Sequence, residues 1–327
     1  MAKRLISLFF VLLLAFGVVS CKGETKRKNK IDIYIIAGQS NAVGHTKITD
    51  RETLLKQIPQ LKSGFDNVLY ASCSRSMTNP QKQDRVVPWQ KVTLDLGRIE
   101  GYMGPEVGMA KVLSAYYRQT DADVGLIKFG HGGTSLLNHK SGANAYGNWV
   151  SPSYAAALRV SYEETDITGK LYRDLCTHVR TYITELIEVY GYTEVRIKGI
   201  YWMQGETDRK QTREYQRAFQ YFATDIRNDL SDLVQGAPIP IFIGTLSLGY
   251  NLVDEKTEQE INRPFIEMQK QLAESLENCY IVDNSAYMIT EWIEGEAVIR
   301  GSDKHHWNQA QMLAIGENAG NVMLGEI

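Results

Sequence analysis

The segment IDIYIIAGQSN, which runs from Ile31 to Asn41, decides the fold class. Its first part, residues 31–37, is almost continuously apolar and rich in isoleucine. Such a run is typical of a strand that is buried on both faces of a parallel sheet. The residues from Gly38 onward predict a turn at the carboxyl end of this strand.

Similar runs recur along the chain and alternate with segments of helical periodicity. The predicted strands are residues 31–37, 68–72, 124–129, 195–203, 239–246 and 280–283. The predicted helices are residues 106–118, 169–190, 212–233, 257–276 and 308–324. Repeated strand–helix units predict an α/β sandwich with one central, mainly parallel sheet. No linker rich in Pro, Gly or Ser divides residues 31–327, so we expect a single domain there.

Composition and charge narrow the class of protein. The chain has 327 residues, of which 43% are hydrophobic and 23% are charged, as in ordinary globular proteins. Its formal net charge of −2 gives no indication of a basic surface, so we expect no nucleic-acid partner.

The first 30 residues have the pattern of an export signal followed by a tether. Lys3 and Arg4 precede an apolar run, residues 5–19, which is shorter than the roughly 20 residues of a membrane-spanning helix. The sequence VVSC at 18–21 resembles the lipobox of a bacterial lipoprotein signal, which implies a mature protein that begins at lipidated Cys21. Residues 1–21 are then the signal and 22–30 a polar tether, and we expect an exported, membrane-anchored lipoprotein of the cell envelope. A buried helix is the alternative for the apolar run.

A long segment with little periodicity, residues 130–168, interrupts the alternation. Loops longer than about 12–15 residues in compact domains are usually functional or disordered. This one carries Tyr146, Trp149, Tyr154 and Tyr162 among Gly, Asn and Ser. The aromatic side chains either stack on sugar rings or anchor the segment to the core. Both alternatives stay open, and Trp149 is a candidate substrate contact.

Polar and glycine-rich clusters lie where a functional site is expected. Residues 38–41, 130–135 and 204–208 each follow a predicted strand, and residues 303–306 come just before the last helix. In open α/β sheets, ligands bind outside the carboxyl ends of the strands. We therefore expect these clusters to meet at one edge of the sheet.

Ser40, Asp303 and His306 match the requirements of nucleophilic catalysis. A serine hydroxyl needs an adjacent base, and the base needs a group that holds it. Asp303 and His306 are three residues apart, so one turn can bring the carboxylate to the imidazole while the other ring nitrogen faces Ser40. Asp283, at the end of a predicted strand, is a less economical alternative for the acid.

An ester-cleaving site also needs hydrogen-bond donors for the oxyanion of the tetrahedral intermediate. The candidates are the backbone N–H of Ser40, a backbone N–H at Gly132 or Gly133, and the side-chain amide of Gln204. Taken alone, the paired glycines indicate only a tight turn.

Other catalytic sets do not fit. The α/β-hydrolase motif G-x-S-x-G is not matched, because the sequence GQSNA at 38–42 ends in alanine. No HExxH or comparable motif occurs, so we expect neither a metal nor another cofactor. The scattered histidines are expected in loops or at the surface: His45, His131, His139 and His178. Cysteines without metal-ligand spacing are expected in the core: Cys73, Cys176 and Cys279.

Together these motifs resemble the SGNH-hydrolase superfamily, and within it the sialate O-acetylesterase-like branch that includes acetylxylan esterases of carbohydrate esterase family 6. The likeness spans about residues 31–324. It is carried by GQSN at 38–41, GPE at 104–106, GGTS at 132–135, WMQGETD at 202–208 and D-x-x-H at 303–306. The resemblance implies a three-layer, flavodoxin-like fold with Ser40 as nucleophile, His306 as base and Asp303 as its partner.

The resemblance also implies roles for neighbouring residues. Gln204 takes the place of the asparagine that supplies the side-chain oxyanion donor in most SGNH enzymes. Other motif residues are expected to shape the site or contact substrate: Gln39, Asn41, Glu206 and Asp208. His131 departs from the family pattern, which has a small residue before the paired glycines.

The sequence thus predicts an esterase that removes acetyl groups from carbohydrate, either acetylated xylan or acetylated sialic acid. The expected partners are an acetylated oligo- or polysaccharide and, through the lipid anchor, a membrane. A lipase or aryl-esterase of the same superfamily is one alternative, and a surface lipoprotein that binds glycan without reacting is another. A sialic-acid carboxylate would need an arginine, for which Arg75, Arg209 and Arg300 are candidates. The oligomeric state stays open.

Overall fold

A computed structural model describes residues 28–74, 85–233, 238–287, 291–293, 296–298, 301 and 303–325. The predicted signal, the lipidation site Cys21 and most of the tether lie outside these residues, as do Arg75 and Arg300. Among the described residues, no helix is long and apolar enough to cross a membrane.

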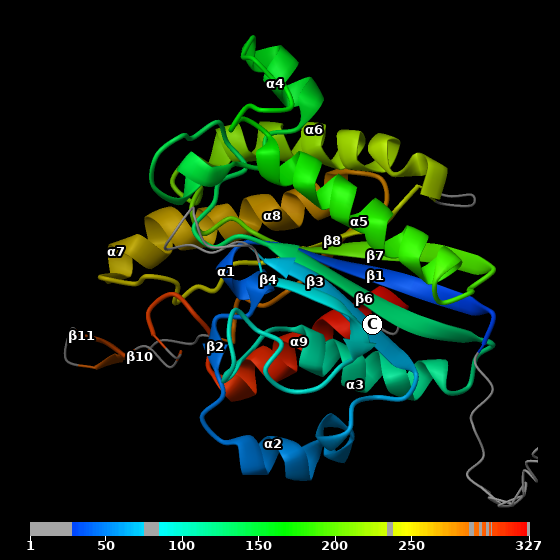
Figure 1. The fold of residues 1–327 in the computed structure, drawn as a ribbon. Coiled ribbons are helices and arrows are strands. Elements are labelled where there is room, and N and C mark those ends of the chain that lie inside the picture. Colours follow the sequence, from blue (N-terminus) through cyan, green and yellow to red (C-terminus); the bar gives the residue numbers. More distant parts are fainter. Residues whose placement is uncertain are drawn as a thin grey trace, which may run out of the picture.

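A seven-stranded sheet forms the middle layer of the molecule (Figure 1). Its strands, in spatial order, are β4 (Arg85–Lys91), β3 (Val68–Ser74), β6 (Ala122–Gly130), β1 (Lys30–Gly38), β7 (Glu194–Met203), β8 (Ile241–Gly244) and β9 (Cys279–Val282). All neighbouring pairs are parallel except β3 and β4. The prediction of a mainly parallel central sheet is confirmed.

Helices cover both faces of the sheet and complete the predicted three layers (Figure 1). One face carries α4 (Pro152–Leu158), α5 (Lys170–Glu188), α6 (Thr212–Asp229) and α8 (Arg263–Ser275); the other carries α2 (Arg51–Gln57), α3 (Glu106–Tyr117) and α9 (Gln309–Leu324). Each face has its own apolar core. Because side chains of a strand alternate between the two faces, β1 contributes Ile33 and Ile35 to one core and Tyr34 and Ile36 to the other.

Short elements connect the layers. They are α1 (Ser40–Val43), the helical turns Pro59–Lys62, Gly142–Tyr146 and Ser231–Leu233, and α7 (Glu255–Thr257), which continues through a π-helix at Glu258–Asn262 into α8. Two small antiparallel ribbons pair β2 (Thr46–Lys47) with β5 (Tyr102–Met103), and β10 (Glu291–Ile293) with β11 (Glu296–Val298).

Two elements differ from the predictions because of proline. Strand β4 was not predicted; it contains Pro88, and it lies at the edge of the sheet, where a missing backbone N–H is tolerated. The helix predicted at 257–276 becomes regular only at Arg263, because Pro264 fits an α-helix only in its first turn.

The order of the strands marks where a ligand can bind. Strand β1 lies between β6 and β7. From β1 the chain builds β3 and β6 on one side and then crosses to β7, β8 and β9 on the other. Such a switch point leaves a crevice at the carboxyl ends of the central strands. The order differs in one respect from that of flavodoxin, because here the second parallel strand, β3, pairs with β6 rather than with β1.

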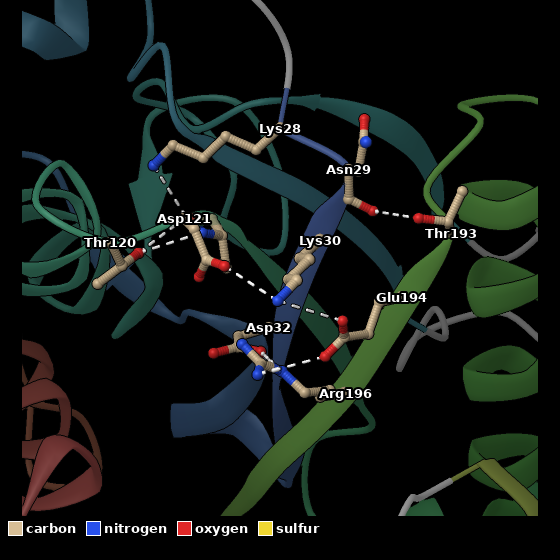
Figure 2. A network of polar contacts seen from close by, with 10 residues as sticks. Lys28, Asn29, Lys30, Asp32, Thr120, Asp121, Thr193, Glu194 and Arg196 are labelled. Atoms are coloured by element: carbon tan, nitrogen blue, oxygen red, sulfur yellow. Dashed lines mark hydrogen bonds and ion pairs between the residues drawn. The ribbon is translucent and has the colours of Figure 1, made fainter.

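The opposite, amino edge of the sheet holds the point where the chain enters the domain. Figure 2 shows Lys30 between Asp121 and Glu194, at 2.9 and 3.5 Å, and Arg196 on Asp32 at 2.5 Å. These ion pairs tie the start of β1 to β7 and to the turn before β6. The chain therefore enters at the edge that faces away from the predicted site.

Candidate active site

Ser40 is the first residue of α1 and follows the central strand β1 at its carboxyl end. Gly38 makes this turn with φ of +145°, and a Cβ at that position would collide with the carbonyl oxygen of Met203 on β7. The N–H of Gln39 donates to the same carbonyl at 3.0 Å. The end of β1 is therefore pinned to β7, and Ser40 stands at the switch point of the sheet.

The structure brings Asp303 and His306 together as predicted from their spacing. The Nδ1 atom of His306 lies 2.9 Å from Oδ2 and 3.1 Å from Oδ1 of Asp303. Partial burial of Asp303 opposes its ionisation, but hydrogen bonds from the ring of His306 and from the N–H groups of His305 and His306 outweigh it and lower the pKa of Asp303. With the carboxylate at Nδ1, Nε2 is the ring nitrogen left for the predicted base function.

The turn that carries His306 docks against the segment that follows α1. Thr46 Oγ1 donates to the carbonyl oxygen of Trp307 at 2.9 Å, and the ring centroids of His45 and His306 are 5.0 Å apart. Asn308 and Gln311 form a capping box that starts α9 just after this turn. These contacts bring residues at the two ends of the domain to the same edge of the sheet.

His45 lies in the loop between α1 and β2, as predicted, but it is buried rather than at the surface. Burial lowers the pKa of His45 to about 3, and the charges of His306 and Arg98 add to this effect. The ring is therefore neutral at physiological pH. A neutral ring beside His306 does not compete with it for a proton.

The paired glycines lie on the strand next to β1. Gly38 and Gly130 are in register at the ends of β1 and β6, and the N–H of His131 donates to the carbonyl oxygen of Gly38 at 3.1 Å. Among the described residues, the N–H groups of Gly132 and Gly133 donate to no other protein group. Both groups are thus available as donors at the same edge as Ser40.

Gln204 and Asp208 hold this glycine loop. The side-chain nitrogen of Gln204 donates to Asp208 Oδ2 at 2.8 Å and to the carbonyl oxygen of Thr134 at 3.0 Å. Asp208 also accepts hydrogen bonds from the Ser135 hydroxyl and, at 2.8 Å, from the N–H of Leu136. Both N–H bonds of the Gln204 amide are thus engaged within the protein. In this arrangement Gln204 braces the loop, and its role as an oxyanion donor stays a prediction.

Glu206, Asn41 and Gln39 connect the nucleophile's turn to the segment after β7. Asn41 Nδ2 donates to Glu206 Oε1 at 2.7 Å, and Gln39 Oε1 lies 3.3 Å from the hydroxyl of Thr207. Glu206 is buried, and burial raises its pKa to about 7 against the opposing effect of the Asn41 hydrogen bond. These motif residues contact one another next to Ser40, and their role in shaping the site stays a prediction.

Trp149 does not offer a surface for a sugar. Its side chain is fully buried, its ring contacts Trp202 edge-on at 5.2 Å, and its Nε1 donates to Thr134 Oγ1 at 2.8 Å. The alternative in which aromatic residues anchor segment 130–168 to the core therefore holds for Trp149. The indole still supports the site indirectly, because it fixes Thr134 next to the paired glycines.

A family comparison agrees with this geometry. The family model described as "Carbohydrate esterase, sialic acid-specific acetylesterase" matches residues 30–324. The chain belongs to this family. The protein is thus an enzyme of the carbohydrate acetylesterase class, as the motifs predicted. No curated protein matches the chain.

Solved structures share the fold of this family member. A protein from Arabidopsis thaliana is 17% identical with a TM-score of 0.53, over 91% of this chain and 98% of that one. NanS is 16% identical with a TM-score of 0.58, also over 91% and 98%. A carbohydrate acetylesterase from Xanthomonas citri is 16% identical with a TM-score of 0.53, over 90% of this chain and 57% of that one. At identities this low, the similarity shows only that this chain shares the fold of these structures.

The structure also places two further residues that the sequence singled out. His131, before the paired glycines, lies in a loop as predicted but is fully buried, with the ring of Tyr146 6.3 Å away. Asp283, the alternative acid, binds Lys270 at 3.0 Å and the N–H of Ser285 at 2.9 Å. Its carboxylate is therefore engaged elsewhere, which leaves Asp303 as the partner of His306.

Arg209, one of the three candidate arginines among which the sequence did not choose, lies beside the candidate site. The guanidinium of Arg209 lies 4.9 Å from the ring centroid of Tyr250 and donates to the carbonyl oxygen of Glu206 at 3.0 Å. The ring of Tyr250 is 5.5 Å from that of His305, the neighbour of the predicted base. The position of Arg209 directly after the QGETD motif is the only signal that could have selected it from the three candidate arginines.

Proposed function

We propose that this protein hydrolyses acetyl esters on a sugar, with O-acetylated sialic acid as its substrate class and an acyl group on Ser40 as the intermediate. The observation that carries the proposal is the Asp303–His306 pair, with Nδ1 at 2.9 Å from the carboxylate, docked through Thr46 and Trp307 onto the segment after Ser40. This arrangement supplies a nucleophile, a base and an orienting acid from the two ends of the domain.

In the proposed reaction, Ser40 Oγ attacks the ester carbonyl carbon while His306 Nε2 accepts the hydroxyl proton. Asp303, bound at Nδ1, stabilises the imidazolium that forms. The backbone N–H groups of Ser40 and of Gly132 or Gly133 bind the oxyanion. His306 then protonates the departing sugar oxygen, and a water molecule, deprotonated by the same histidine, releases acetate from Ser40.

Arg209 favours an acidic sugar over a neutral one. Sialic acid carries a carboxylate, whereas the xylose units of xylan carry none. A guanidinium pairs with a carboxylate through two parallel hydrogen bonds. Arg209 is fixed beside Glu206 and Tyr250, next to the residues that flank the base, and this position supports a role in holding the substrate's acid group.

The decisive experiment compares wild type with Ser40→Ala on a small aryl acetate and on acetylated sugars. The variant should lose roughly 10⁴-fold or more in kcat, because the nucleophile is removed while the oxyanion donors remain. Ser74→Ala is the matched control, since Ser74 ends β3 at the same edge of the sheet. Unchanged turnover by Ser40→Ala would remove Ser40 from the mechanism.

Product analysis on a panel of esters tests the substrate class. We expect acetate release from O-acetylated sialic acid to exceed that from acetylated xylan, and Arg209→Gln to raise KM for the acidic sugar alone. Preference for long-chain or aryl esters would favour the lipase or aryl-esterase alternative. Glycan binding by intact protein that releases no acetate would favour the non-catalytic alternative.

A further inference from the structure

A buried lysine lies directly behind the nucleophile's helix. Lys128, near the carboxyl end of β6, is 2% exposed. Its ammonium donates to the carbonyl oxygens of Val43 at 3.0 Å and Leu96 at 2.8 Å, and to Glu106 Oε2 at 2.9 Å. An ammonium group has three N–H bonds, so each one has an acceptor.

Glu106 completes this ion pair. It is fully buried at the start of α3, and its second carboxylate oxygen accepts a hydrogen bond from the N–H of Gly104 at 2.8 Å. The N-terminus of a helix favours a negative charge. Burial lowers the pKa of Lys128, and the Glu106 carboxylate opposes this change. A buried ion pair is often no more stabilising than apolar side chains of the same volume, so stability alone does not explain its presence.

The contact with Val43 reaches the nucleophile. Val43 is the last residue of α1 and Ser40 is the first, and a helix leaves its final carbonyl groups without a partner in the helix. A helix of a single turn does not persist without contacts to the rest of the protein. A cation at its C-terminus satisfies one of these carbonyls and matches the helix dipole.

The segment after Val43 leads to the predicted base. Gly44 has φ of +94°, and a Cβ there would lie 2.7 Å from the N atom of Gly104. The next residue, His45, lies beside His306, with the ring centroids 5.0 Å apart and the ring planes tilted by 32°. The carbonyl that Lys128 holds is thus placed between the nucleophile and the side chain that contacts the base.

We propose that Lys128 is a positioning residue of the active site, which holds α1 through the Val43 carbonyl and so sets the direction of the Ser40 hydroxyl. This inference rests on the proposed function of Ser40. Lys128 acts through the backbone and does not touch substrate. Glu106 compensates the charge of the buried ammonium, and we assign it a role in stability.

Substitutions of Lys128 and of Glu106 have different expected effects, so comparing them distinguishes a role in positioning Ser40 from a role in stability. Lys128→Met removes the donor to Val43, whereas Glu106→Gln leaves a lysine that still has N–H bonds for Val43 and Leu96. Both variants should lower the midpoint of thermal unfolding. Only Lys128→Met should lower kcat strongly, by about 10- to 100-fold with KM within about twofold, because a misplacement of about 1 Å costs rates of this order.

The experiment measures kcat, KM and the rate of Ser40 labelling by a fluorophosphonate, well below the unfolding temperature of each variant. The matched control is Lys111→Met, which breaks the exposed Lys111–Glu317 pair between α3 and α9. Slower labelling and a lower kcat in Lys128→Met alone are the expected result. Wild-type rates in folded Lys128→Met, or equal losses in both pair variants, would overturn the proposal. Absence of esterase activity in wild type would instead reject the proposed function.

Discussion

The carboxylates at the site have opposite environments. Asp303 is about half-exposed and accepts several hydrogen bonds, which outweigh its partial burial and lower its pKa. Glu206 is 3% exposed and receives one hydrogen bond, from Asn41, so burial dominates and its pKa rises to about 7. The carboxyl group of Asp303 is therefore a charged partner of His306, whereas that of Glu206 is partly protonated near neutral pH and holds the side chain of Asn41, next to Ser40.

The raised pKa of Glu206 predicts a dependence of stability on pH. A carboxyl group whose pKa rises on folding contributes stability below its unfolded pKa of 4.5 and loses that contribution as the pH rises through about 7. Glu206→Gln keeps an acceptor for Asn41 and cannot ionise. It should therefore match wild type near pH 4.5 and exceed it near pH 8, by up to about 3 kcal/mol.

Urea unfolding of wild type and Glu206→Gln at both pH values measures this difference. Asp303→Asn is a useful contrast, because its carboxyl pKa is lowered in the folded state and its loss should cost stability at neutral pH. Equal effects of Glu206→Gln at the two pH values would contradict the assignment.

At the scale of elements, the glycine loop after β6 has no regular structure of its own and depends on side chains from elsewhere. Asp208, which follows β7, accepts from Ser135 and Leu136, and Trp149 Nε1 donates to Thr134 Oγ1. These contacts fix the backbone that directly follows the N–H groups at Gly132 and Gly133. The direction of the candidate oxyanion donors is therefore set by residues that need not touch substrate.

Asp208→Asn should misalign these donors, because an amide nitrogen replaces one of the two acceptor oxygens. We expect kcat to fall by about 10²-fold, the scale of losing an oxyanion contact, with a smaller change in KM. Asp225→Asn is the matched control: Asp225 is buried and accepts from the N–H and hydroxyl of Ser153 at 2.9 and 2.7 Å. A similar loss of kcat in both variants would indicate general destabilisation rather than a positioned loop.

At the scale of the whole molecule, the chain enters at one edge of the sheet and the site lies at the other. Lys30 and Arg196 secure the start of β1 at the amino edge (Figure 2), and Ser40 follows β1 at the carboxyl edge. The predicted tether, residues 22–30, joins the domain at the amino edge. We therefore propose that a lipid anchor at Cys21 leaves the active edge turned away from the membrane.

Cys21→Ser tests the anchor. The variant should lose incorporation of labelled palmitate and move from the membrane fraction to the soluble fraction. Its kcat and KM on a soluble aryl acetate should equal those of wild type, because the described chain enters the domain at the edge opposite the candidate site. Cys176→Ser is the control for loss of a thiol. A wild-type protein that takes up no label would reject lipidation.

Much of the fold could be predicted because its signals are local. A buried parallel strand needs a continuous apolar run and a covering helix needs an apolar stripe, and both patterns are visible in the sequence. The pairing of Asp303 with His306 is equally local, since three residues separate them. Strand β4 was not predicted because it contains Pro88, which is unfavourable in strands other than edge strands. The helical turn Gly142–Tyr146 and helix α4 were not predicted because segment 130–168 shows little helical periodicity.

By itself, the sequence determined the α/β class, the family motifs and the candidate residues Ser40, Asp303 and His306. Only the tertiary structure decided which partners these residues meet: that His45 is buried against His306, that the Gln204 amide is engaged by Thr134 and Asp208, and that Lys128 holds the helix of Ser40. The physical reason is that burial and hydrogen-bond partners come from segments far apart in the chain. Packing on both faces of the sheet brings these distant segments together, and a local sequence pattern does not indicate which of them will meet.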